Sequence, residues 1–347
     1  MTSGIEKRKR AHIDTVLTED VVAKGVATGF EKYFFEHVAL PELDLDSVDT
    51  RCNLFGKSLA VPLLISSMTG GTDVALDINR HLAEAAQELG IAMGVGSQRA
   101  AIVNPAYADT FRVRNVAPDI LLFANLGAVQ FNYGFTVYDA QKAVAMIEAD
   151  ALFLHLNPLQ EAVQAEGDRN WSGVFRKIEE LVPALDVPVI VKEVGNGISA
   201  DLARRLVGIG VAGVDVAGAG GTSWSEVEAH RQGDEKMRQV AHSFSGWGIP
   251  TVQALSDIRA VLPDTPVIAS GGVRSGVDVA KAIRLGADLV GMAAPALGAA
   301  TKTVNAVETQ MSGVAEELKI AMFCTGSPNL SALRRAVLRA AADGTHL

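Results

Sequence analysis

One segment of the chain brings together residue types that can bind a metal ion and move protons. In order it reads His155, Leu156, Asn157, Pro158, Leu159, Gln160 and Glu161. The apolar run before it is typical of a buried strand, in which alternate side chains share a face, so His155 and Asn157 point to one side. Pro158 ends the strand and presents the following residues from a loop. Glu161 beside amide side chains offers hard oxygen ligands, and we expect it to bind Mg²⁺.

Lys192 is the second residue whose position suggests chemistry. It ends another apolar run, residues 188–191. A charged lysine at the end of a buried strand is costly in free energy unless it meets an anion. Its neighbour Glu193 points to the opposite face of the strand and cannot easily serve. We therefore expect Lys192 to face a negatively charged ligand.

Small and hydroxyl-bearing residues follow most of the other apolar runs. The segments concerned are residues 66–71, 94–99, 218–224 and 269–274. Glycine, serine and threonine let a ligand approach the main chain closely, and Arg99 in the second segment suits an anion. The glycines of the third segment lack the spacing of a dinucleotide-binding turn, and the chain has no phosphate loop of the GxxxxGK[ST] type.

Eight short apolar runs supply the elements that must position these residues. They are residues 61–65, 91–95, 120–124, 151–156, 188–191, 213–216, 266–269 and 288–292. The runs lack a polar alternate face, as strands buried on both sides do. They start at intervals that suit strand-plus-helix units. This cadence predicts an α/β fold, a (β/α)8 TIM barrel, whereas a doubly wound open sheet is the alternative that the local pattern allows.

Helix signals separate the runs. Asp73 is a candidate cap for a helix that extends to Leu89, and Gly90 follows where a C-cap glycine belongs. Ser199 and Ser275 are expected to open two further helices. The gap between the sixth and seventh runs is unusually long, and we interpret it as a functional loop that acts as a lid.

The predicted barrel gathers the chemistry at the carboxyl ends of its strands. The loops after strands seven and eight of such barrels often hold a phosphate, and Gly271, Gly272, Ala293 and Ala294 lie there. Together with Lys192, which would neutralise the charge of a reduced ring, this arrangement suits flavin mononucleotide. Arg99 and the basic residues near the N-terminus indicate a second anion.

Composition limits the classes of function. The 347 residues carry 31 basic and 40 acidic side chains, a net charge of −9, which argues against a general binder of nucleic acid or of membrane surfaces. The two cysteines give no disulfide framework, and no transmembrane or secretory segment is visible, so we expect a cytoplasmic protein. We assign residues 1–59 to an N-terminal arm with little regular structure and residues 60–347 to the catalytic barrel.

These motifs together resemble the type 2 isopentenyl-diphosphate delta-isomerases, which are FMN-dependent. The likeness rests on Arg8–Lys9 with His12 and on residues 68–71, 96–97, 125–126, 155–161, 191–195, 215–224 and 269–274. It extends over nearly the whole chain. The resemblance implies interconversion of isopentenyl and dimethylallyl diphosphate in isoprenoid biosynthesis, with reduced FMN, NADPH as its reductant, Mg²⁺ and no net redox change. It also implies a homo-oligomer, a tetramer or octamer.

The resemblance also implies roles residue by residue. Contacts to FMN are implied for Ser67, Met68, Thr69, Ser97, Asn125, Lys192, Thr222, Gly271, Gly272, Val273, Ala293 and Ala294. Substrate contacts are implied for Arg8, Lys9, His12, Ser97, Gln98, Arg99 and Gln160. Catalytic roles are implied for Lys192, Gln160, His155 and Asn157, and metal ligation for Glu161. Ala11 departs from the polar or charged residue of many members, which affects the details of arm closure.

The same barrel allows three other functions. An FMN-linked hydroxy-acid oxidase or dehydrogenase needs a His–Arg pair on the late loops, but Arg274 has no histidine beside it in the sequence. A purine-nucleotide dehydrogenase needs a cysteine in a loop, and Cys52 and Cys324 lie outside the predicted strand ends. A flavin- or phosphate-binding sensor without catalysis is the third alternative.

Overall fold

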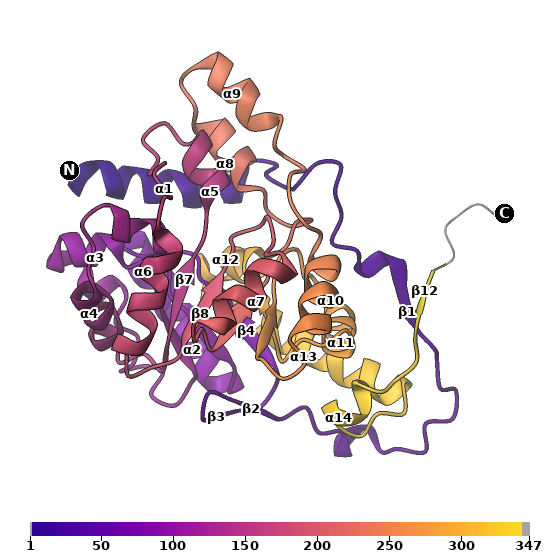
Figure 1. The fold of residues 1–347 in the computed structure, drawn as a ribbon. Coiled ribbons are helices and arrows are strands. Elements are labelled where there is room, and N and C mark those ends of the chain that lie inside the picture. The colour runs from indigo at the N-terminus through magenta and orange to yellow at the C-terminus, as the bar shows by residue number, and fades with distance from the viewer. Residues whose placement is uncertain (1, 342–347) are drawn as a thin grey trace.

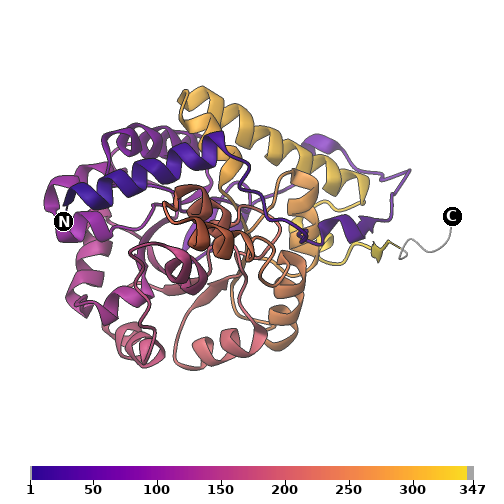
Figure 2. The ribbon, with the colours of Figure 1, turned by 90° about the horizontal axis from the view of Figure 1, so that it is seen from above.

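Eight parallel strands close into a barrel, as Figure 1 and the view from above in Figure 2 show. The computed structural model describes residues 2–341, so residue 1 of the predicted arm and residues 342–347 of the predicted barrel lie outside it. The strands are β4 (Leu63–Ile65), β5 (Ala92–Gly94), β6 (Leu122–Gly127), β7 (Ala151–His155), β8 (Val189–Lys192), β9 (Gly213–Asp215), β10 (Val267–Ala269) and β11 (Leu289–Met292). Hydrogen bonds between β11 and β4 complete the ring, which confirms the predicted barrel and excludes the open sheet.

Helices surround the ring of strands (Figure 2). The longer ones are α2 (Asp73–Leu89), α4 (Val137–Ile147), α6 (Val174–Leu181), α7 (Ala200–Gly208), α10 (Thr251–Val261), α11 (Gly276–Arg284) and α13 (Val304–Cys324). Shorter ones are α3 (Arg99–Val103), α5 (Pro158–Val163), α12 (Ala294–Ala300) and α14 (Leu330–Leu333). The 3-10 helices are η1 (Phe30–Lys32), η2 (Leu45–Ser47), η3 (Pro105–Thr110), η4 (Ala128–Asn132) and η5 (Val182–Ala184).

The helix caps are the predicted residues in all but one case. The hydroxyls of Ser199 and Ser275 accept backbone hydrogen bonds at the starts of α7 and α11, which confirms both caps. Gly90 ends α2 in the left-handed conformation, as expected. The N-cap of α2 is Thr72 rather than Asp73, because the Thr72 hydroxyl accepts from the amide of Ala75 and Asp73 already belongs to the first turn.

The first part of the N-terminal arm is a helix, so the expectation of little regular structure was wrong there. Residues Thr2–Thr18 form α1, which is rich in charged residues with good helix propensity. The helix packs on α8 and α3 at the carboxyl end of the barrel and buries Ile13. Tertiary contacts of this kind are hard to foresee from a segment with little apolar periodicity.

The rest of the arm runs down the outside of the barrel (Figure 1). Its strand β1 (Tyr33–Phe35) pairs antiparallel with β12 (Leu338–Ala340), so the arm contacts the last described strand of the chain. Strands β2 (Cys52–Leu54) and β3 (Lys57–Leu59) form a hairpin. Its Leu54 and Leu59 join the apolar cluster inside the barrel, which includes Phe123 and Phe153 stacked with ring centroids 4.2 Å apart.

The long segment between β9 and β10 carries two helices above the barrel. They are α8 (Trp224–Arg231) and α9 (Glu235–His242), seen at the top of Figure 1. Helix α8 packs against α1 and α5, and Trp224 contacts His12 of α1 edge to face with centroids 5.2 Å apart. The segment thus covers the carboxyl end of the barrel, where a lid was expected.

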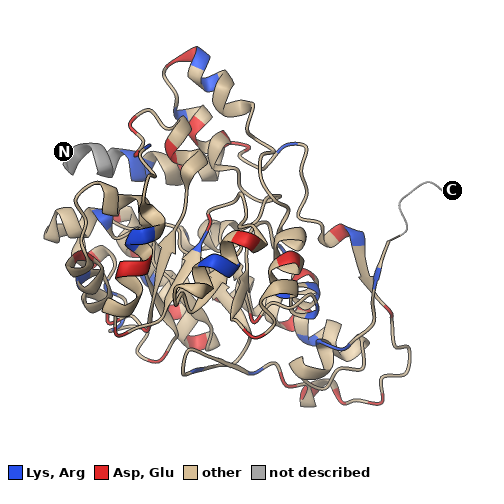
Figure 3. Cartoon of the chain, in the orientation of Figure 1, with Lys and Arg blue, Asp and Glu red and all other residues tan. Residues whose placement is uncertain are grey.

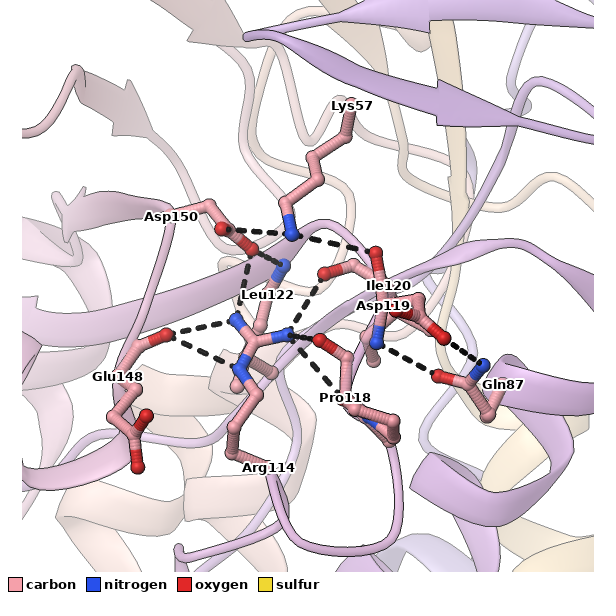
Figure 4. Close-up of polar contacts among 10 residues, drawn as sticks. Lys57, Gln87, Arg114, Pro118, Asp119, Ile120, Leu122, Glu148 and Asp150 are labelled. Carbon is pink, nitrogen blue, oxygen red and sulfur yellow. Dashed lines mark hydrogen bonds and ion pairs between the residues drawn. The ribbon is translucent and has the colours of Figure 1, made fainter.

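An arginine clamp fastens the opposite end of the barrel (Figure 4). Arg114 donates to the carbonyls of Ala117, Pro118 and Ile120 and to that of Glu148, at 2.8–3.3 Å. It also pairs with Asp150 at 2.8 Å, the carboxylate that accepts the amide of Leu122 at the start of β6. Lys57 of the β2–β3 hairpin lies 3.3 Å from the same carboxylate. The clamp ties the β6 and β7 starts to the hairpin below them.

The same clamp recurs on the far side of the ring. Arg259 donates to the carbonyls of Leu262, Pro263 and Thr265, at the sequence offsets that Arg114 uses, and to Asp288 at 2.6 Å. Asp288 accepts the amide at the start of β10. Strands β10 and β11 lie opposite β6 and β7 in the closed barrel, so two equivalent clamps hold the two halves.

Loss of the first clamp should destabilise the barrel. We expect Arg114→Ala to lower the free energy of unfolding by about 3 kcal/mol, because several carbonyls and a half-buried carboxylate lose their charged donor. Denaturant unfolding followed by fluorescence measures it. Arg112→Ala is the matched control, since that exposed arginine pairs only with nearby Asp109, and we expect a change within about 0.5 kcal/mol. Equal losses for the two variants would contradict the clamp's role.

Candidate active site

A cavity of about 650 Å³ opens at the carboxyl ends of the strands, beneath α1 and α8. This volume lies in the range of small-molecule sites. Of the residues expected at the site, it is lined by Arg8, Lys9, His12, Ser67, Met68, Thr69, Ser97, Arg99, Asn125, His155, Asn157, Gln160, Glu161, Lys192, Thr222, Gly271, Gly272, Val273, Ala293 and Ala294. Residues distant in the sequence therefore share one enclosed site.

Gln98 is the exception, and its expected contact with substrate needs correction. Its side chain is fully buried and is not part of the cavity wall. The amide nitrogen donates to the carbonyl of Ala143 at 2.8 Å, and the amide oxygen accepts the backbone N–H of Asn125 at 3.0 Å. Gln98 thus braces β6 against α4. In a short turn, one residue's difference decides which side chain faces the ligand.

Lys192 ends β8 at the floor of the cavity and is almost fully buried. Its ammonium donates to the carbonyl of Glu193 and lies 3.9 Å from Oδ2 of Asp215, its register partner on β9. The Glu193 carboxylate points elsewhere and accepts three backbone amides, from Val194, Gly195 and Asn196. Among the described residues, the carboxylate within ion-pair distance of the Lys192 ammonium is Asp215, a residue that the sequence did not single out.

His155 lies beside Lys192 on the neighbouring strand β7. Its Nδ1 donates to the side-chain oxygen of Asn125 at 2.8 Å. Burial lowers the pKa of His155 to about 3, and the positive charges of Lys192 and Lys9 act in the same direction. The imidazole is consequently neutral at physiological pH, so it can hydrogen-bond a ligand without adding a positive charge to the cavity.

Three basic side chains gather at the end of the cavity beneath α1. Lys9 donates to the carbonyl of Ser97 at 2.8 Å and lies over the ring of Phe111. Burial lowers its pKa to about 7, and Arg8 and Arg99 lower it further by repulsion. Arg8 is affected in the same way, and burial lowers its pKa. Cations held this close in a buried site favour a multiply charged anion.

Glu161 is a buried carboxylate on α5 near the basic cluster. Its oxygens accept from the side-chain amide of Asn157 at 3.0 Å and from the backbone N–H of Asp168 at 2.6 Å. Burial raises its pKa, although these hydrogen bonds act in the opposite direction. Asp168 in turn pairs with Arg99. The described part of the chain contains no cluster of three or more His, Cys, Asp or Glu able to hold a metal ion, so ligand oxygens would have to complete a site at Glu161.

Glu228 of α8 is a polar residue of the site that the sequence did not reveal. It is 2% exposed and accepts from Nε2 of His12 at 2.9 Å and from the amide of Gln160 at 3.1 Å. Arg231 of the same helix also donates to it. Burial raises the pKa of Glu228, but its bond to His12 and these positive charges outweigh burial and hold the pKa below its usual value. It lies in a charged stretch that resembles a solvated helix face, and only the packing of α8 on α1 reveals its burial.

The cavity wall has the features that a flavin requires. Gly271 and Gly272 have φ of 102° and 73°, and a Cβ at Gly271 would lie 2.2 Å from the carbonyl oxygen of Gly218, so only glycine fits. These glycines, together with the small residues Ala293 and Ala294 after the neighbouring strand β11, let a phosphate approach the main chain. The hydroxyls of Ser66 and Ser67 are buried without a partner in the described structure. A polar ring system would satisfy them.

Neither cysteine belongs to this site. Cys52 and Cys324 are free thiols. Burial raises the pKa of Cys52 to about 11, so its thiol stays protonated and unreactive at neutral pH.

Two features concern the molecule as a whole. Figure 3 colours acidic and basic residues along the chain, and both signs occur on the elements around the barrel. Among the described helices, none combines the length and the apolar character that crossing a bilayer requires.

The chain is similar in sequence to a known family model and to proteins of known name. The family model of FMN-dependent dehydrogenases matches residues 2–110 and 137–340. A protein of Synechocystis sp. named isopentenyl-diphosphate delta-isomerase is 60% identical over 331 residues, 95% of each chain. One of the same name from Stutzerimonas stutzeri is 56% identical over 336 residues, 96% of this chain and 97% of that one.

Solved structures share the fold at low identity. A flavocytochrome b2 variant is 19% identical with a TM-score of 0.70, covering 97% of this chain and 85% of that one. A mandelate oxidase variant with benzaldehyde is 21% identical with a TM-score of 0.65, covering 98% of each chain. At such identity, the likeness is evidence for the barrel and not for the reaction.

Anion binding at the basic cluster should be coupled to proton uptake. With a pKa of about 7, Lys9 is largely neutral at pH 8, and a bound anion would raise its pKa and charge it. We expect inorganic pyrophosphate to bind at pH 8 with uptake of up to about one proton, and its affinity to fall as the pH rises above 7. Calorimetry in two buffers of different ionisation enthalpy measures the uptake.

The Lys9→Met variant should lose that uptake, while Lys24→Met serves as the control, because Lys24 is an exposed lysine paired with Asp20. Equal uptake by Lys9→Met and the unmodified protein would contradict the assignment to Lys9.

Proposed function

This chain belongs to the isopentenyl-diphosphate delta-isomerases of the FMN-dependent type, and we propose that its cavity interconverts isopentenyl and dimethylallyl diphosphate beside bound reduced FMN. The observation that carries the proposal is that one cavity contains two separate groups of positive charge. Lys192 lies at the floor, where it can face a flavin ring. Arg8 and Lys9 of α1 line the other end of the cavity together with Arg99, and there they can neutralise a diphosphate.

The FMN would be held by residues from the ends of most strands. These are Ser67, Met68, Thr69, Ser97, Asn125, Lys192, Thr222, Gly271, Gly272, Val273, Ala293 and Ala294, all of which line the cavity. Gly271 and Gly272 would approach the phosphate and Lys192 the ring. Reduced FMN, when bound, supplies an electron-rich ring whose nitrogens can give and take a proton without net redox change. NADPH is the reductant we expect to maintain that state.

The diphosphate of the substrate would lie at the other end. We assign its binding to Arg8, Lys9, His12, Ser97, Arg99 and Gln160. Glu161 would hold Mg²⁺, since hard oxygen ligands suit that ion, and the ion would supply positive charge to neutralise the diphosphate. The hydrogen bonds from Asn157 and from the Asp168 amide hold the Glu161 carboxylate in one orientation. The reacting carbons are thereby anchored through a group that does not react.

The remaining walls would protect the reaction from water. Protonation of an unactivated alkene produces a tertiary centre with carbocation character, which water would trap. Apolar side chains of Ile13, Val16 and Leu297 line the cavity and exclude solvent there. Neutral His155 and the amides of Asn157 and Gln160 orient the five-carbon unit without adding positive charge. Lys192 offsets the negative charge of the reduced ring.

Substitution of Lys192 tests the proposal directly. We expect Lys192→Ala to lose turnover by about a hundredfold or more with saturating FMN, NADPH and Mg²⁺, because the ring loses its counter-charge. Formation of dimethylallyl diphosphate from the isopentenyl isomer, followed by NMR, measures it. Lys302→Ala, a change of an exposed lysine on the barrel surface, is the control and should keep full activity. Full activity of Lys192→Ala would rule the role out.

Replacement of the metal-binding carboxylate gives a separate result. We expect Glu161→Gln to raise the Mg²⁺ concentration needed for half-maximal rate by about tenfold or more, because a neutral amide binds the ion more weakly. Magnesium titration of the isomerisation rate measures it. Glu166→Gln, five residues along the chain and exposed, is the control. An unchanged titration for Glu161→Gln would remove Glu161 from the metal site.

A further inference from the structure

Three neighbouring positions on the cavity floor form a line of polar groups. Lys192 and Asp215 are register partners on β8 and β9, with the ammonium 3.9 Å from Oδ2 of the carboxylate. The hydroxyl of Ser270, which follows β10, donates to Oδ1 of Asp215 at 2.6 Å. The amide of Ala217 donates to the same oxygen at 3.2 Å. The carboxylate is thus fixed by two donors on the side away from Lys192.

Asp215 itself does not reach the cavity. Its side chain is 0% exposed and is absent from the cavity wall, whereas Lys192 and Ser270 both belong to that wall. Oδ2, the oxygen on the side of Lys192, has no hydrogen-bond partner in the described structure. An oxygen of a fully buried carboxylate left in this state is costly unless a charge nearby compensates it. Burial raises the pKa of Asp215, whereas the ammonium of Lys192 and the hydrogen bond from Ser270 lower it and favour the ionised carboxylate. The ammonium of Lys192 is the charge that compensates Oδ2.

The other charged groups near Lys192 do not share this role. The carboxylate of Glu193 is occupied by three backbone amides. His155, on the other side of Lys192, is held neutral by its burial. Asp215 is therefore the carboxylate paired with Lys192 among the described residues.

We propose that Asp215 is a positioning residue that holds the Lys192 ammonium at the cavity floor and offsets part of its charge, so that it sets the reduction potential of the bound flavin. The proposal rests on the proposed function, in which Lys192 faces the flavin ring. Because Asp215 lies behind Lys192, its negative charge opposes the accumulation of negative charge on the reduced ring. The register of β8 and β9 fixes the distance between Asp215 and Lys192, so the carboxylate acts on the ammonium from a constant position.

The isosteric variant Asp215→Asn isolates the charge. We expect reduced FMN to bind more tightly relative to oxidised FMN by about tenfold, which for a two-electron couple raises the midpoint potential by about 30 mV. Spectroscopic redox titration of the protein–FMN complex at one fixed pH measures this without reference to isomerisation. A midpoint that stays constant or falls in Asp215→Asn would overturn the proposal. Failure of the unmodified chain to bind FMN would overturn the proposed function instead.

Two further variants keep the test sharp. Asp150→Asn removes a carboxylate of comparable structural importance at the opposite end of the barrel, so it should affect stability but leave the midpoint unchanged. A shift equal to that of Asp215→Asn would assign the effect to general damage and overturn the proposal. Should Asp215→Asn not fold, Ser270→Ala provides the test, because it removes the donor that favours the ionised carboxylate. We expect this variant to increase the affinity for reduced relative to oxidised FMN at least about twofold, and so to raise the midpoint potential. No shift in Ser270→Ala would then overturn it.

Discussion

The burial of one ammonium group, that of Lys192, is the constraint on which the site depends. A charged lysine at the end of a barrel strand requires compensation. Among the described residues its ion-pair partner is Asp215, which lies 3.9 Å away and has no hydrogen bond to the ammonium. The remaining donor capacity faces a cavity of about 650 Å³. The fold thereby maintains a positive charge in a place with little water, where its effect on a ligand is much larger than at the surface. An electron-rich ring is the kind of ligand that this site stabilises.

A second group of positive charges, three basic side chains, lines the cavity at a distance from Lys192. Arg8, Lys9 and Arg99 gather at the other end of the cavity, and burial together with the repulsion from the two arginines lowers the pKa of Lys9. Helix α1 contributes two of the three, so the chain closes its own site with the residues that bind the anion. Glu228 on α8 fastens this cover through His12 and Gln160. Binding, water exclusion and closure thus depend on the same contacts between α1, α5 and α8.

Much of this could be predicted from the sequence, because strand ends in a parallel barrel converge whatever the distance between them along the chain. The apolar runs predicted all eight strands, and the strand ends predicted His155, Lys192 and the glycines of residues 271–272. Helix α1 was missed because its propensity is weak evidence without its packing on α8. Glu228 was missed for a similar reason, since a charged helix face and a buried one look alike in sequence. The substrate contact that the resemblance implied for Gln98 is not seen, because its side-chain amide is used in hydrogen bonds to the main chain at Ala143 and Asn125.

The central expectation is that the cavity binds a reduced flavin and that the isomerisation takes place beside it. The most direct test is to strip the protein of flavin, confirm that it stays folded and colourless, and measure isomerisation while reduced FMN is added back in substoichiometric steps. The account predicts no turnover without FMN and a rate that rises in proportion to the occupied fraction until one FMN per chain is bound. Isomerisation at the full rate by the colourless protein would contradict it.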